Sequence, residues 1–302
     1  MIKQKLAITG LSGFLGEAIA DSLAEHYMLI DLFHKTRSNK RVSQSIPVDL
    51  TNKKSTQDVL KKVKPDYILH LAAATHIDNC EADRHLSKAS KAWILNVEAT
   101  RTLAEYANSS AAHILMLSTE CVFSGKKKLY NESDTTSPVS WYGHTKREAE
   151  EVLLTLAPQA TVLRAAIAYD DGTHPRSLST MLLSQLRKGM PFSVVKNQRI
   201  TPTHIGQISA YTLAALQQKA SGIFHAAPSD TTSPYDFAIS LAGARNLNQE
   251  LAKPVTLLKF FGQQRAQLRL RNACLSSTYS SKKLSVPLQT ISDVFATMEQ
   301  AR

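Results

Sequence analysis

The chain has 302 residues, of which 43% are hydrophobic and 20% are charged, and its formal net charge is +11. This composition is ordinary for a globular protein, its apolar runs are too short to cross a bilayer, and its length allows one large domain or a core with a smaller lobe. The positive charge suits an anionic ligand, but the cations are scattered and form no nucleic-acid-reading motif, so we expect neither nucleic acid nor a membrane as a partner.

Short apolar segments alternate with amphipathic segments through the first half of the chain. They predict strands at 6–9, 28–33, 67–72, 113–118 and 160–165, and helices at 15–25, 55–63, 86–108 and 142–154. Such alternation is typical of a parallel sheet with helices on both faces. We therefore predict an α/β fold, a Rossmann doubly wound parallel sheet that binds ligands at the carboxyl ends of its strands.

The turn after the first predicted strand contains Gly10, Gly13 and Gly16 at the spacing G-x-x-G-x-x-G. In a strand–turn–helix unit, such glycines allow a tight turn, close approach of the backbone to a pyrophosphate, and close packing of helix on strand. Free amides at the start of the helix then face the phosphates. The motif predicts a dinucleotide-binding turn, with an ordinary glycine-rich turn as the alternative. A P-loop is disfavoured because no Gly-Lys-Ser/Thr follows.

The end of the second predicted strand bears on the choice of cofactor. An acid there would hold the ribose hydroxyls of NAD, whereas cations accommodate the additional phosphate of NADP. Asp31 lies inside the predicted strand, and the residues that follow it include His34, Lys35 and Arg37. We therefore expect NADP to be preferred over NAD, with a solvated basic loop as the alternative.

Three residues further along the chain form a candidate catalytic set. Tyr142 and Lys146 form a Y-x-x-x-K pair on one face of a predicted helix, and Thr119 follows the strand at 113–118. A nearby ammonium and the positive nicotinamide ring of the oxidised cofactor would lower the pKa of a tyrosine, which can then exchange a proton with a carbonyl oxygen. Thr119 would hydrogen-bond the same oxygen. The alternatives are a chance Y-x-x-x-K in an ordinary helix and a threonine that caps a turn.

The alternation of strands and helices weakens after residue 165, where prolines divide the chain into shorter pieces. We expect residues 1–165 to form the NAD(P)-binding domain. A return to this domain is predicted at about 204–226, through a helix at 207–217 and a strand at 222–225. We expect residues 166–302 to form mainly a smaller C-terminal substrate-binding lobe.

The three cysteines, Cys80, Cys121 and Cys274, are far apart and odd in number. Without C-x-x-C spacing they argue against a disulfide framework, and the chain enters a strand at its start rather than a signal peptide. We therefore expect a cytoplasmic protein. His76 and Cys80 stand four residues apart without further ligands nearby, so no metal site is expected.

Taken together, these motifs and several further segments resemble the extended short-chain dehydrogenase/reductases, and within them the dTDP-4-dehydrorhamnose reductase branch. The resemblance spans about residues 5 to 285. The segments that carry it, besides the glycine turn, are 71–81 (LAAATHIDNCE), 96–97 (NV), 118–125 (STECVFSG), 130–132 (YNE), Pro138, 142–146 (YGHTK), 163–164 (LR), 198–203 (QRITPT) and 222–225 (GIFH).

This resemblance implies an NAD(P)H-dependent oxidoreductase that reduces the 4-keto group of a nucleotide-linked deoxysugar, as in dTDP-rhamnose and polysaccharide biosynthesis. It implies that Thr119, Tyr142 and Lys146 are catalytic and that Asn96 supports them. Residues expected to contact the cofactor also include Gly10, Ser12, Gly13, Phe14, Leu15, Asp49, Leu50, Leu71, Ala72, Ala73, Asn96, Tyr142 and Lys146. Thr75 and Thr119 are expected to contact the sugar nucleotide, and a homodimer is compatible with the sequence.

Two departures from the family pattern concern the substrate. Where the family commonly has Arg-Thr-Ser-Trp, this chain has Arg-Ala-Ala-Ile at 164–167, so an apolar wall of the sugar pocket is missing. Near the C-terminus, Arg-Leu-Arg-Asn at 269–272 replaces the usual Arg-Pro-x-Asn. Arg269 and Arg271 are candidates for binding the substrate diphosphate, since guanidinium groups suit its oxygens. Surface arginines are the alternative.

Two other functions are compatible with the same residues. The segments 198–204 and 271–273 also resemble the regulatory beta subunit of methionine adenosyltransferase, which keeps the dinucleotide fold as a partner-binding protein. A fold does not fix a function, and an intact Thr119, Tyr142 and Lys146 set suits either protein. A sugar-nucleotide epimerase or dehydratase is the third alternative. The segment 118–123 resembles these enzymes less than it resembles the reductase branch.

Overall fold

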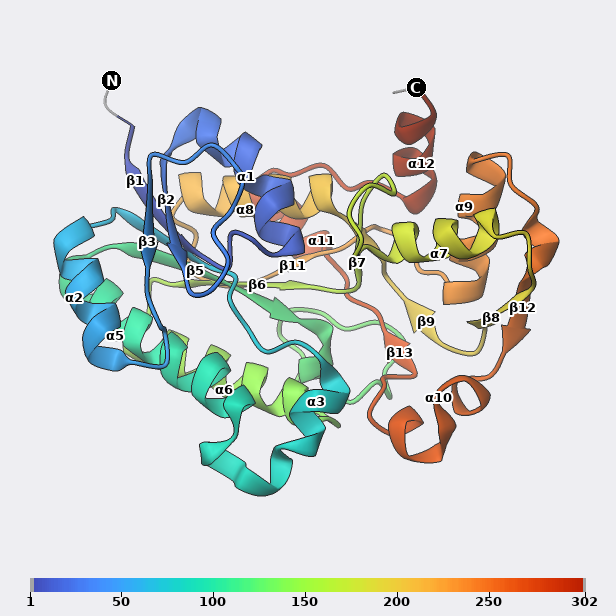
Figure 1. The fold of residues 1–302 in the computed structure, drawn as a ribbon, viewed down its shortest axis with the longest axis horizontal. Helices are drawn as coiled ribbons and strands as arrows, with labels where there is room; N and C mark the ends of the chain where they lie inside the picture. The colour runs from blue at the N-terminus through green and yellow to red at the C-terminus, as the bar shows by residue number, and fades with distance from the viewer. Residues whose placement is uncertain (1–2, 301–302) are drawn as a thin grey trace.

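A seven-stranded parallel sheet forms the centre of the computed structural model, which describes residues 3–300 (Figure 1). The strand order is β11-β6-β5-β4-β1-β2-β3. The strands are β1 (Lys5–Thr9), β2 (Met28–Phe33), β3 (Gln44–Pro47), β4 (Tyr67–His70), β5 (His113–Thr119), β6 (Thr161–Ala165) and β11 (Gly222–Ala226). The chain moves outward from β1 in one direction and from β4 in the other, so the sheet is doubly wound, as predicted.

Helices cover both faces of this sheet (Figure 1). Because side chains alternate along a strand, Leu6 and Ile8 of β1 pack toward one face and Ala7 packs toward the other. The first face is covered by α1 (Phe14–His26), α8 (Ile205–Gln217) and α11 (Thr278–Leu284). The second is covered by α2 (Lys53–Val63), α5 (Ala99–Ser110) and α6 (Trp141–Leu156).

A smaller lobe lies beyond the carboxyl ends of the strands, on the right of Figure 1. Its core includes Tyr169, Phe237 and Phe295, whose ring centroids lie 5.0 to 6.1 Å apart. The lobe contains α7 (Leu178–Arg187), α9 (Pro234–Ala244), α10 (Leu257–Ala266), α12 (Ile291–Gln300) and the parallel pair β8 (Phe192–Val195) and β12 (Ala252–Val255). Two further pairs, β7 (Ala168–Tyr169) with β10 (Thr203–His204) and β9 (Arg199–Ile200) with β13 (Asn272–Ala273), connect it to the sheet.

The structure differs from the predicted elements in two places. β3 was not predicted, since Ile46 is its one large apolar residue; its proline is tolerated because β3 lies at the edge of the sheet. The helix predicted at 86–108 is interrupted, because Ser87 adopts a left-handed φ of 50° and Ser90 caps a new helix start. This region contains α3 (Ile77–Ala82), a 3-10 turn (Arg84–Ala89), α4 (Lys91–Trp93) and a π-helical turn (Ile94–Glu98) before α5.

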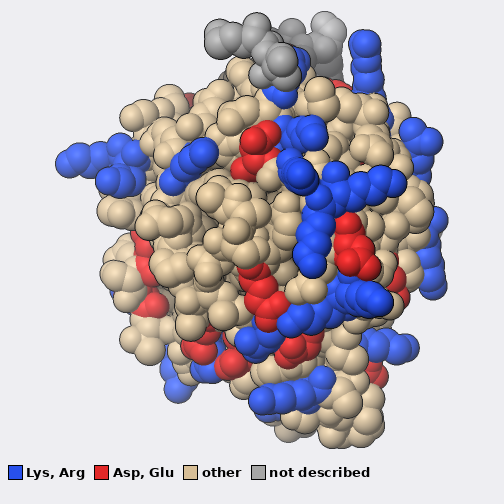
Figure 2. Space-filling model, turned by 90° about the vertical axis from the view of Figure 1, so that its left-hand side faces the viewer, with Lys and Arg blue, Asp and Glu red and all other residues tan. Residues whose placement is uncertain are grey.

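Charge is distributed over the surface without one dominant patch on the face shown in Figure 2, where lysine and arginine side chains lie among carboxylates. Ion pairs such as Lys53 with Glu105 and Lys40 with Asp21 occur on the surface. Within residues 3–300, no helix has the length and apolar character that a bilayer crossing requires.

Candidate active site

A cleft of about 900 Å³ opens at the carboxyl ends of the central strands, beside the point where the winding of the sheet reverses. The glycine turn, the loop after β4, the end of β5, the start of α6 and the segment after β6 all contribute to its lining. The predicted site residues that line this cleft are Gly10, Ser12, Gly13, Phe14, Leu15, Leu71, Ala72, Ala73, Thr75, Thr119 and Tyr142.

The glycine turn has the shape that a close approach to phosphate requires. Gly10 has a φ of +76°, and a Cβ there would lie 2.7 Å from the backbone nitrogen of Ala72. A Cβ on Gly16 would lie 2.5 Å from the carbonyl oxygen of Leu11, so helix α1 can pack on the turn only with glycine there. Gly13 is the N-cap of α1 and has no side chain that could accept from the amides of the first turn. These amides remain free for an anion.

A second cavity of about 560 Å³ continues from the first past the end of β2. Gly10, Ser12, Ala72 and Ala73 line both cavities, so the two form one groove on either side of the glycine turn. The predicted contacts His34, Lys35, Asp49 and Leu50 line the second cavity. Hydrogen bonds from Thr51 lower the pKa of Asp49, which therefore presents an ionised carboxylate there.

The loop after β2 is fixed by Asp31. This aspartate is fully buried, and its Oδ2 accepts a hydrogen bond of 3.0 Å from the amide of Ser38. Arg37 lies close enough to lower the pKa of Asp31, although burial raises that pKa more strongly. Arg37 does not line the second cavity, whereas Asp31 does. His34 and Lys35 therefore line the groove, whereas Arg37 lies outside its lining and near Asp31.

The start of α6 places Tyr142 in the cleft. Ser140 caps the helix by accepting from the amide of Gly143 at 3.2 Å, which puts Tyr142 in the first helical turn. A Cβ on Gly143 would overlap the carbonyl oxygen of Cys121, so glycine lets α6 approach the end of β5 closely. Lys146, one turn further along the helix, is buried, and its Nζ donates a hydrogen bond of 2.8 Å to the carbonyl oxygen of Leu117. The structure thus brings Thr119, Tyr142 and Lys146 together at one edge of the sheet.

The pKa of Tyr142 differs from the expectation. We expected Lys146 and an oxidised nicotinamide to lower this pKa; in the structure, burial raises it well above its usual value, and the neighbouring Cys121 and Glu120 raise it further. Burial also lowers the pKa of Lys146 to about 8. Desolvation dominates because the protein removes most of the water around both groups, although Tyr142 lines the cleft. Tyr142 is consequently a neutral phenol, which is a proton donor.

Asn96 holds the loop after β4 rather than lining the cleft. Its Oδ1 accepts from the amide of Ala74 at 2.8 Å, and its Nδ2 donates to the carbonyl oxygen of Ala74 and to Oγ1 of Thr145. These bonds join the π-helical turn to α6 and to the loop that carries Ala72, Ala73 and Thr75. The structure therefore gives Asn96 a supporting position.

Arg269 and Arg271 do not line the cleft. Arg269 forms a two-pronged ion pair with Asp78 of α3, in which Nη2 lies 2.8 Å from Oδ2. Its guanidinium also lies 4.5 Å from the centre of the Phe261 ring. Arg271 is exposed, and its carbonyl oxygen accepts from the amide of Arg199. The guanidinium of Arg269 is therefore paired with the Asp78 carboxylate in this structure.

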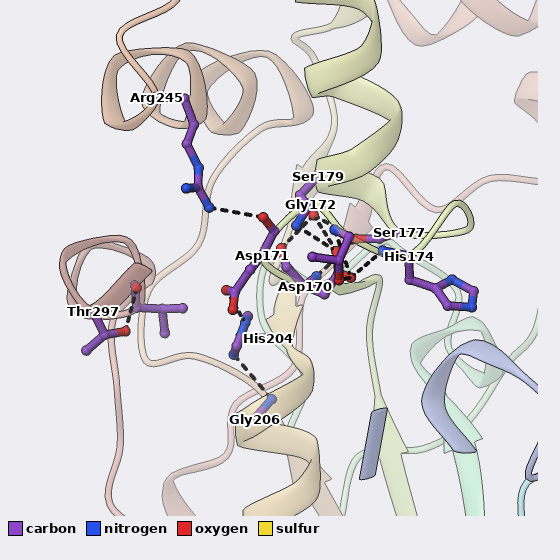
Figure 3. A network of polar contacts seen from close by, with 12 residues as sticks. Asp170, Asp171, Gly172, His174, Ser177, Ser179, His204, Gly206, Arg245 and Thr297 are labelled. Carbon is purple, nitrogen blue, oxygen red and sulfur yellow. Dashed lines mark hydrogen bonds and ion pairs between the residues drawn. The ribbon is translucent and has the colours of Figure 1, made fainter. Parts of the chain in front are cut away.

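A loop from the smaller lobe reaches the glycine turn. Asp170 holds this loop, accepting from the amides of Gly172 and His174 and from Oγ of Ser179 (Figure 3). The His174 ring stacks on Phe14 at a centroid distance of 4.7 Å, and its Nε2 lies 3.7 Å from Glu17. The stack joins the lobe to the first turn of α1 and positions the rim of the cleft.

Several residues that line the cleft were not predicted as site residues, namely Glu120, Cys121, Arg176 and Met181. Arg176 and Met181 follow no motif, and only the folding of the loop after β7 brings them to the cleft. Glu120 directly follows Thr119, so its position beside a candidate catalytic residue was the available signal. Ala166 and Ile167 occupy the segment where the family commonly has a tryptophan.

A buried ion pair lies beside this site. Nη2 of Arg164 on β6 lies 2.6 Å from Oε2 of Glu150 on α6, and both side chains are at most 4% exposed. Oε1 of the same carboxylate accepts from Nε of Arg164 at 3.0 Å and from the hydroxyl of Ser118. Glu150 lies one helical turn after Lys146 and opposes the lowering of the Lys146 pKa by burial. The pair therefore connects α6 to the ends of β5 and β6.

The parallel sheet, the glycine turn and the Tyr142 and Lys146 pair together define an extended short-chain dehydrogenase/reductase. The family model described as "RmlD substrate binding domain" matches residues 4–299. The chain therefore belongs to the RmlD substrate-binding family.

Curated relatives and a solved structure agree with this family. The chain is 31% identical over 252 residues to a probable dTDP-4,6-dihydroxy-2-methyloxan-3-one 4-ketoreductase of Streptomyces antibioticus, covering 82% of this chain and 80% of the relative. It is 30% identical to a dTDP-4-dehydrorhamnose reductase of Aggregatibacter actinomycetemcomitans, covering 78% of each. The methionine adenosyltransferase 2 subunit beta of Xenopus laevis is 26% identical, covering 84% of this chain and 75% of that protein. The structure of a Bacillus anthracis dTDP-4-dehydrorhamnose reductase in complex with NADP superimposes with a TM-score of 0.83 at 22% identity, covering 99% of this chain and 98% of that one.

Proposed function

We propose that this protein is an NAD(P)H-dependent reductase of the 4-keto group of a nucleotide-linked deoxysugar, similar to dTDP-4-dehydrorhamnose reductase. One observation carries the proposal: Tyr142 and Thr119 line the same cleft as the glycine turn, and Lys146 lies buried beneath them. A proton donor therefore lies beside a groove that fits a dinucleotide. The named 4-ketoreductase and dehydrorhamnose reductase relatives, at 31% and 30% identity, support the same reaction.

The groove fits a nicotinamide dinucleotide. At Gly10 and Gly16 a Cβ would collide with neighbouring backbone atoms. Glycine at these positions therefore allows the tight turn after which the backbone amides of α1 can face a pyrophosphate. We assign NADP as the preferred cofactor, with His34, Lys35 and Arg37 as the groups that would accommodate its additional phosphate. Asp49 and Leu50 would hold the adenosine end. The reduced nicotinamide, when bound, supplies the hydride for the reaction.

The residues of this chain then supply the proton. The neutral phenol of Tyr142 donates its proton to the carbonyl oxygen as the carbonyl carbon is reduced, so that the ketone becomes an alcohol. Thr119 hydrogen-bonds the same oxygen and stabilises the charge that develops on it. Lys146 would hold the ribose next to the nicotinamide and, as an ammonium below its pKa of about 8, would favour the phenolate that Tyr142 becomes.

The division of the chain follows from this assignment. Residues 1–165, with the return at about 204–226, would bind the cofactor, and residues 166–302 would mainly hold the sugar nucleotide. Thr75 and Arg176 lie in the cleft lining and are candidates for contact with that substrate. Ile167 stands where the family commonly has a tryptophan, so we expect a roomier sugar pocket. We also assign the protein to the cytoplasm and allow a homodimer.

A regulatory subunit is the second candidate function, and the 26% identity to the methionine adenosyltransferase subunit beta favours it. The reductase has the stronger support, because the relatives named as ketoreductases reach higher identity and because Tyr142 faces an open cleft. An epimerase or dehydratase is a weaker third candidate, supported by likeness in fold alone.

The proposal is tested by supplying the purified protein with NADPH and a panel of dTDP-linked and UDP-linked 4-keto-6-deoxysugars. We expect NADPH oxidation, measured by the loss of its absorbance, together with a reduced sugar nucleotide identified by mass spectrometry. Binding of NADPH without turnover of any member of the panel would favour the regulatory subunit.

The choice of cofactor gives a separate prediction. Replacing both Lys35 and Arg37 with alanine should raise the Kd for NADPH by about ten- to a hundredfold, since a hydrogen bond to a charged group contributes about 1.5–3 kcal/mol. The Kd for NADH should change by less than about threefold on the same scale. Fluorescence titration of each nucleotide measures both constants.

Lys126→Ala with Lys128→Ala is the matched control, because it removes the same charge from exposed positions outside the groove. Equal loss of affinity for NADPH and NADH in the Lys35 and Arg37 variant would refute the assignment of these residues to the additional phosphate.

A further inference from the structure

Glu120 is a buried acid at the reacting edge of the cleft that the proposed mechanism does not use. It begins the 3-10 turn Glu120–Val122, directly after β5, and lines the cleft together with Thr119 and Tyr142. The residue is only 8% exposed. Its Oε2 lies 2.8 Å from Oγ1 of Thr119, the hydroxyl that we assign to the substrate oxygen.

The surroundings of Glu120 favour its neutral form. Among the residues that the structure describes, no lysine, arginine or histidine nitrogen lies within ion-pair distance of its carboxylate. The titratable groups that face it are Cys121 in its own turn, Tyr142 from α6 and Cys274 after β13, and none of them carries a positive charge. Arg269 lies near Cys121, but it is paired with Asp78. Burial accordingly raises the pKa of Glu120, and it outweighs the hydrogen bonds with Thr119, with the backbone and with Cys121, which lower this pKa.

The protonation state of Glu120 decides whether the Thr119 hydroxyl can donate a hydrogen bond to the substrate. A threonine hydroxyl has one proton to donate and two lone pairs that accept. One lone pair of Oγ1 already accepts from the amide of Cys121 at 3.2 Å. If Glu120 is ionised, it can only accept, so it takes the one proton of Thr119. Thr119 then has nothing to donate to a ketone oxygen, which also only accepts.

We propose that Glu120 is a positioning residue whose protonated carboxyl donates to Oγ1 of Thr119 and thereby directs the Thr119 proton to the substrate carbonyl oxygen. This inference rests on the proposed function, because it requires Thr119 to contact that oxygen. If Glu120 were ionised, the Thr119 hydroxyl would donate to its carboxylate, and the hydrogen bond to the substrate oxygen would be lost. The protonation of one carboxyl therefore sets how well the site stabilises the developing oxyanion.

The decisive variant is Glu120→Gln, whose neutral amide can donate to Thr119 at every pH. In the unmodified protein, kcat/KM should fall as the pH rises through the pKa of Glu120, by up to about a hundredfold, the usual cost of losing one oxyanion donor. Glu120→Gln should remove this fall and keep only the part that Lys146 causes above its pKa of about 8. Profiles of the two proteins that superimpose would overturn the proposal.

A double-mutant cycle separates action through Thr119 from a direct effect of the Glu120 charge on Tyr142. In a Thr119→Ala background, Glu120→Gln should leave the pH profile unchanged. If Glu120→Gln changes the pH profile equally with and without Thr119, then Glu120 does not act through Thr119, and the proposal is wrong. Glu105→Gln is the matched control, because Glu105 lies on α5, pairs with Lys53 and is outside the cleft. It should give the profile of the unmodified protein.

A spectroscopic measurement tests the protonation without turnover. At neutral pH, the infrared absorption of a protonated carboxyl should be present in the unmodified protein and absent from Glu120→Gln. Its absence from the unmodified protein would overturn the proposal even if the sugar is reduced. Conversely, a protein that shows this band but reduces no member of the 4-keto-sugar panel would contradict the proposed function, which is a distinguishable failure.

Discussion

Replacing Tyr142 with phenylalanine should lower kcat for a 4-keto-sugar nucleotide by about 10²- to 10⁴-fold, the usual contribution of a positioned general acid. The substitution removes one hydroxyl and leaves the ring that packs at the start of α6. The glycine turn and the groove beyond it do not involve this hydroxyl, so the Kd for NADPH should remain within about twofold. Steady-state kinetics and fluorescence titration measure the two quantities on the same preparation.

Tyr279→Phe is the matched control for this substitution. Tyr279 is 55% exposed and its ring stacks on Phe224, away from the cleft, so the loss of its hydroxyl should leave kcat unchanged. Turnover by Tyr142→Phe within about threefold of the unmodified protein would mean that another group donates the proton, because a lost general acid costs at least about a hundredfold. Glu120 would then be the next candidate, since it also lines the cleft.

The second large effect concerns stability. Glu150→Ala should lower the free energy of unfolding by about 3–5 kcal/mol, because it leaves the buried guanidinium of Arg164 without its carboxylate. Arg164 would keep only weak contacts of 3.5 Å, with the carbonyl oxygen of Glu132 and with Nε2 of His225. Its cation–π contact with Phe123 cannot replace the lost charge. Thermal and denaturant unfolding, followed by circular dichroism, measure the loss.

The double variant Glu150→Leu with Arg164→Met distinguishes an unpaired charge from lost packing. Replacing both members of a buried ion pair by apolar residues of similar volume is often neutral or stabilising, so this variant should recover most of the lost stability. The hydroxyl of Ser118 would lose its acceptor, at a cost of about 1 kcal/mol. If the double variant is as unstable as Glu150→Ala, packing rather than charge decides the stability at this position.

Local pattern predicted much of the fold and of the groove. The strands at β1, β2, β5 and β6 were recognised because continuous apolar runs of this length are typical of strands buried on both faces. The glycine spacing predicted the turn because positions such as Gly10 need a backbone that only glycine adopts easily. β3 was missed because it has one large apolar residue, Ile46, and the interruption at Ser87 was missed because nothing in the local pattern indicates it.

The arrangement of charge in the site could not be predicted from the sequence. The Y-x-x-x-K spacing suggested that Lys146 lowers the pKa of Tyr142, but burial of the phenol outweighs that effect. Arg269 was expected near a diphosphate, whereas the fold places Asp78 against it. Both outcomes depend on which groups from distant segments become neighbours and on how much water remains around them.

The sequence by itself determined the parallel sheet, the position of the glycine turn and the identity of the residues that meet at its edge, because these follow from periodicity and from residue types at short spacing. Only the tertiary structure decided their protonation, the pairing of Arg269, and the meeting of Thr119 with a buried Glu120. Desolvation and ion pairing depend on contacts between segments far apart in the chain, and a linear pattern does not contain those contacts.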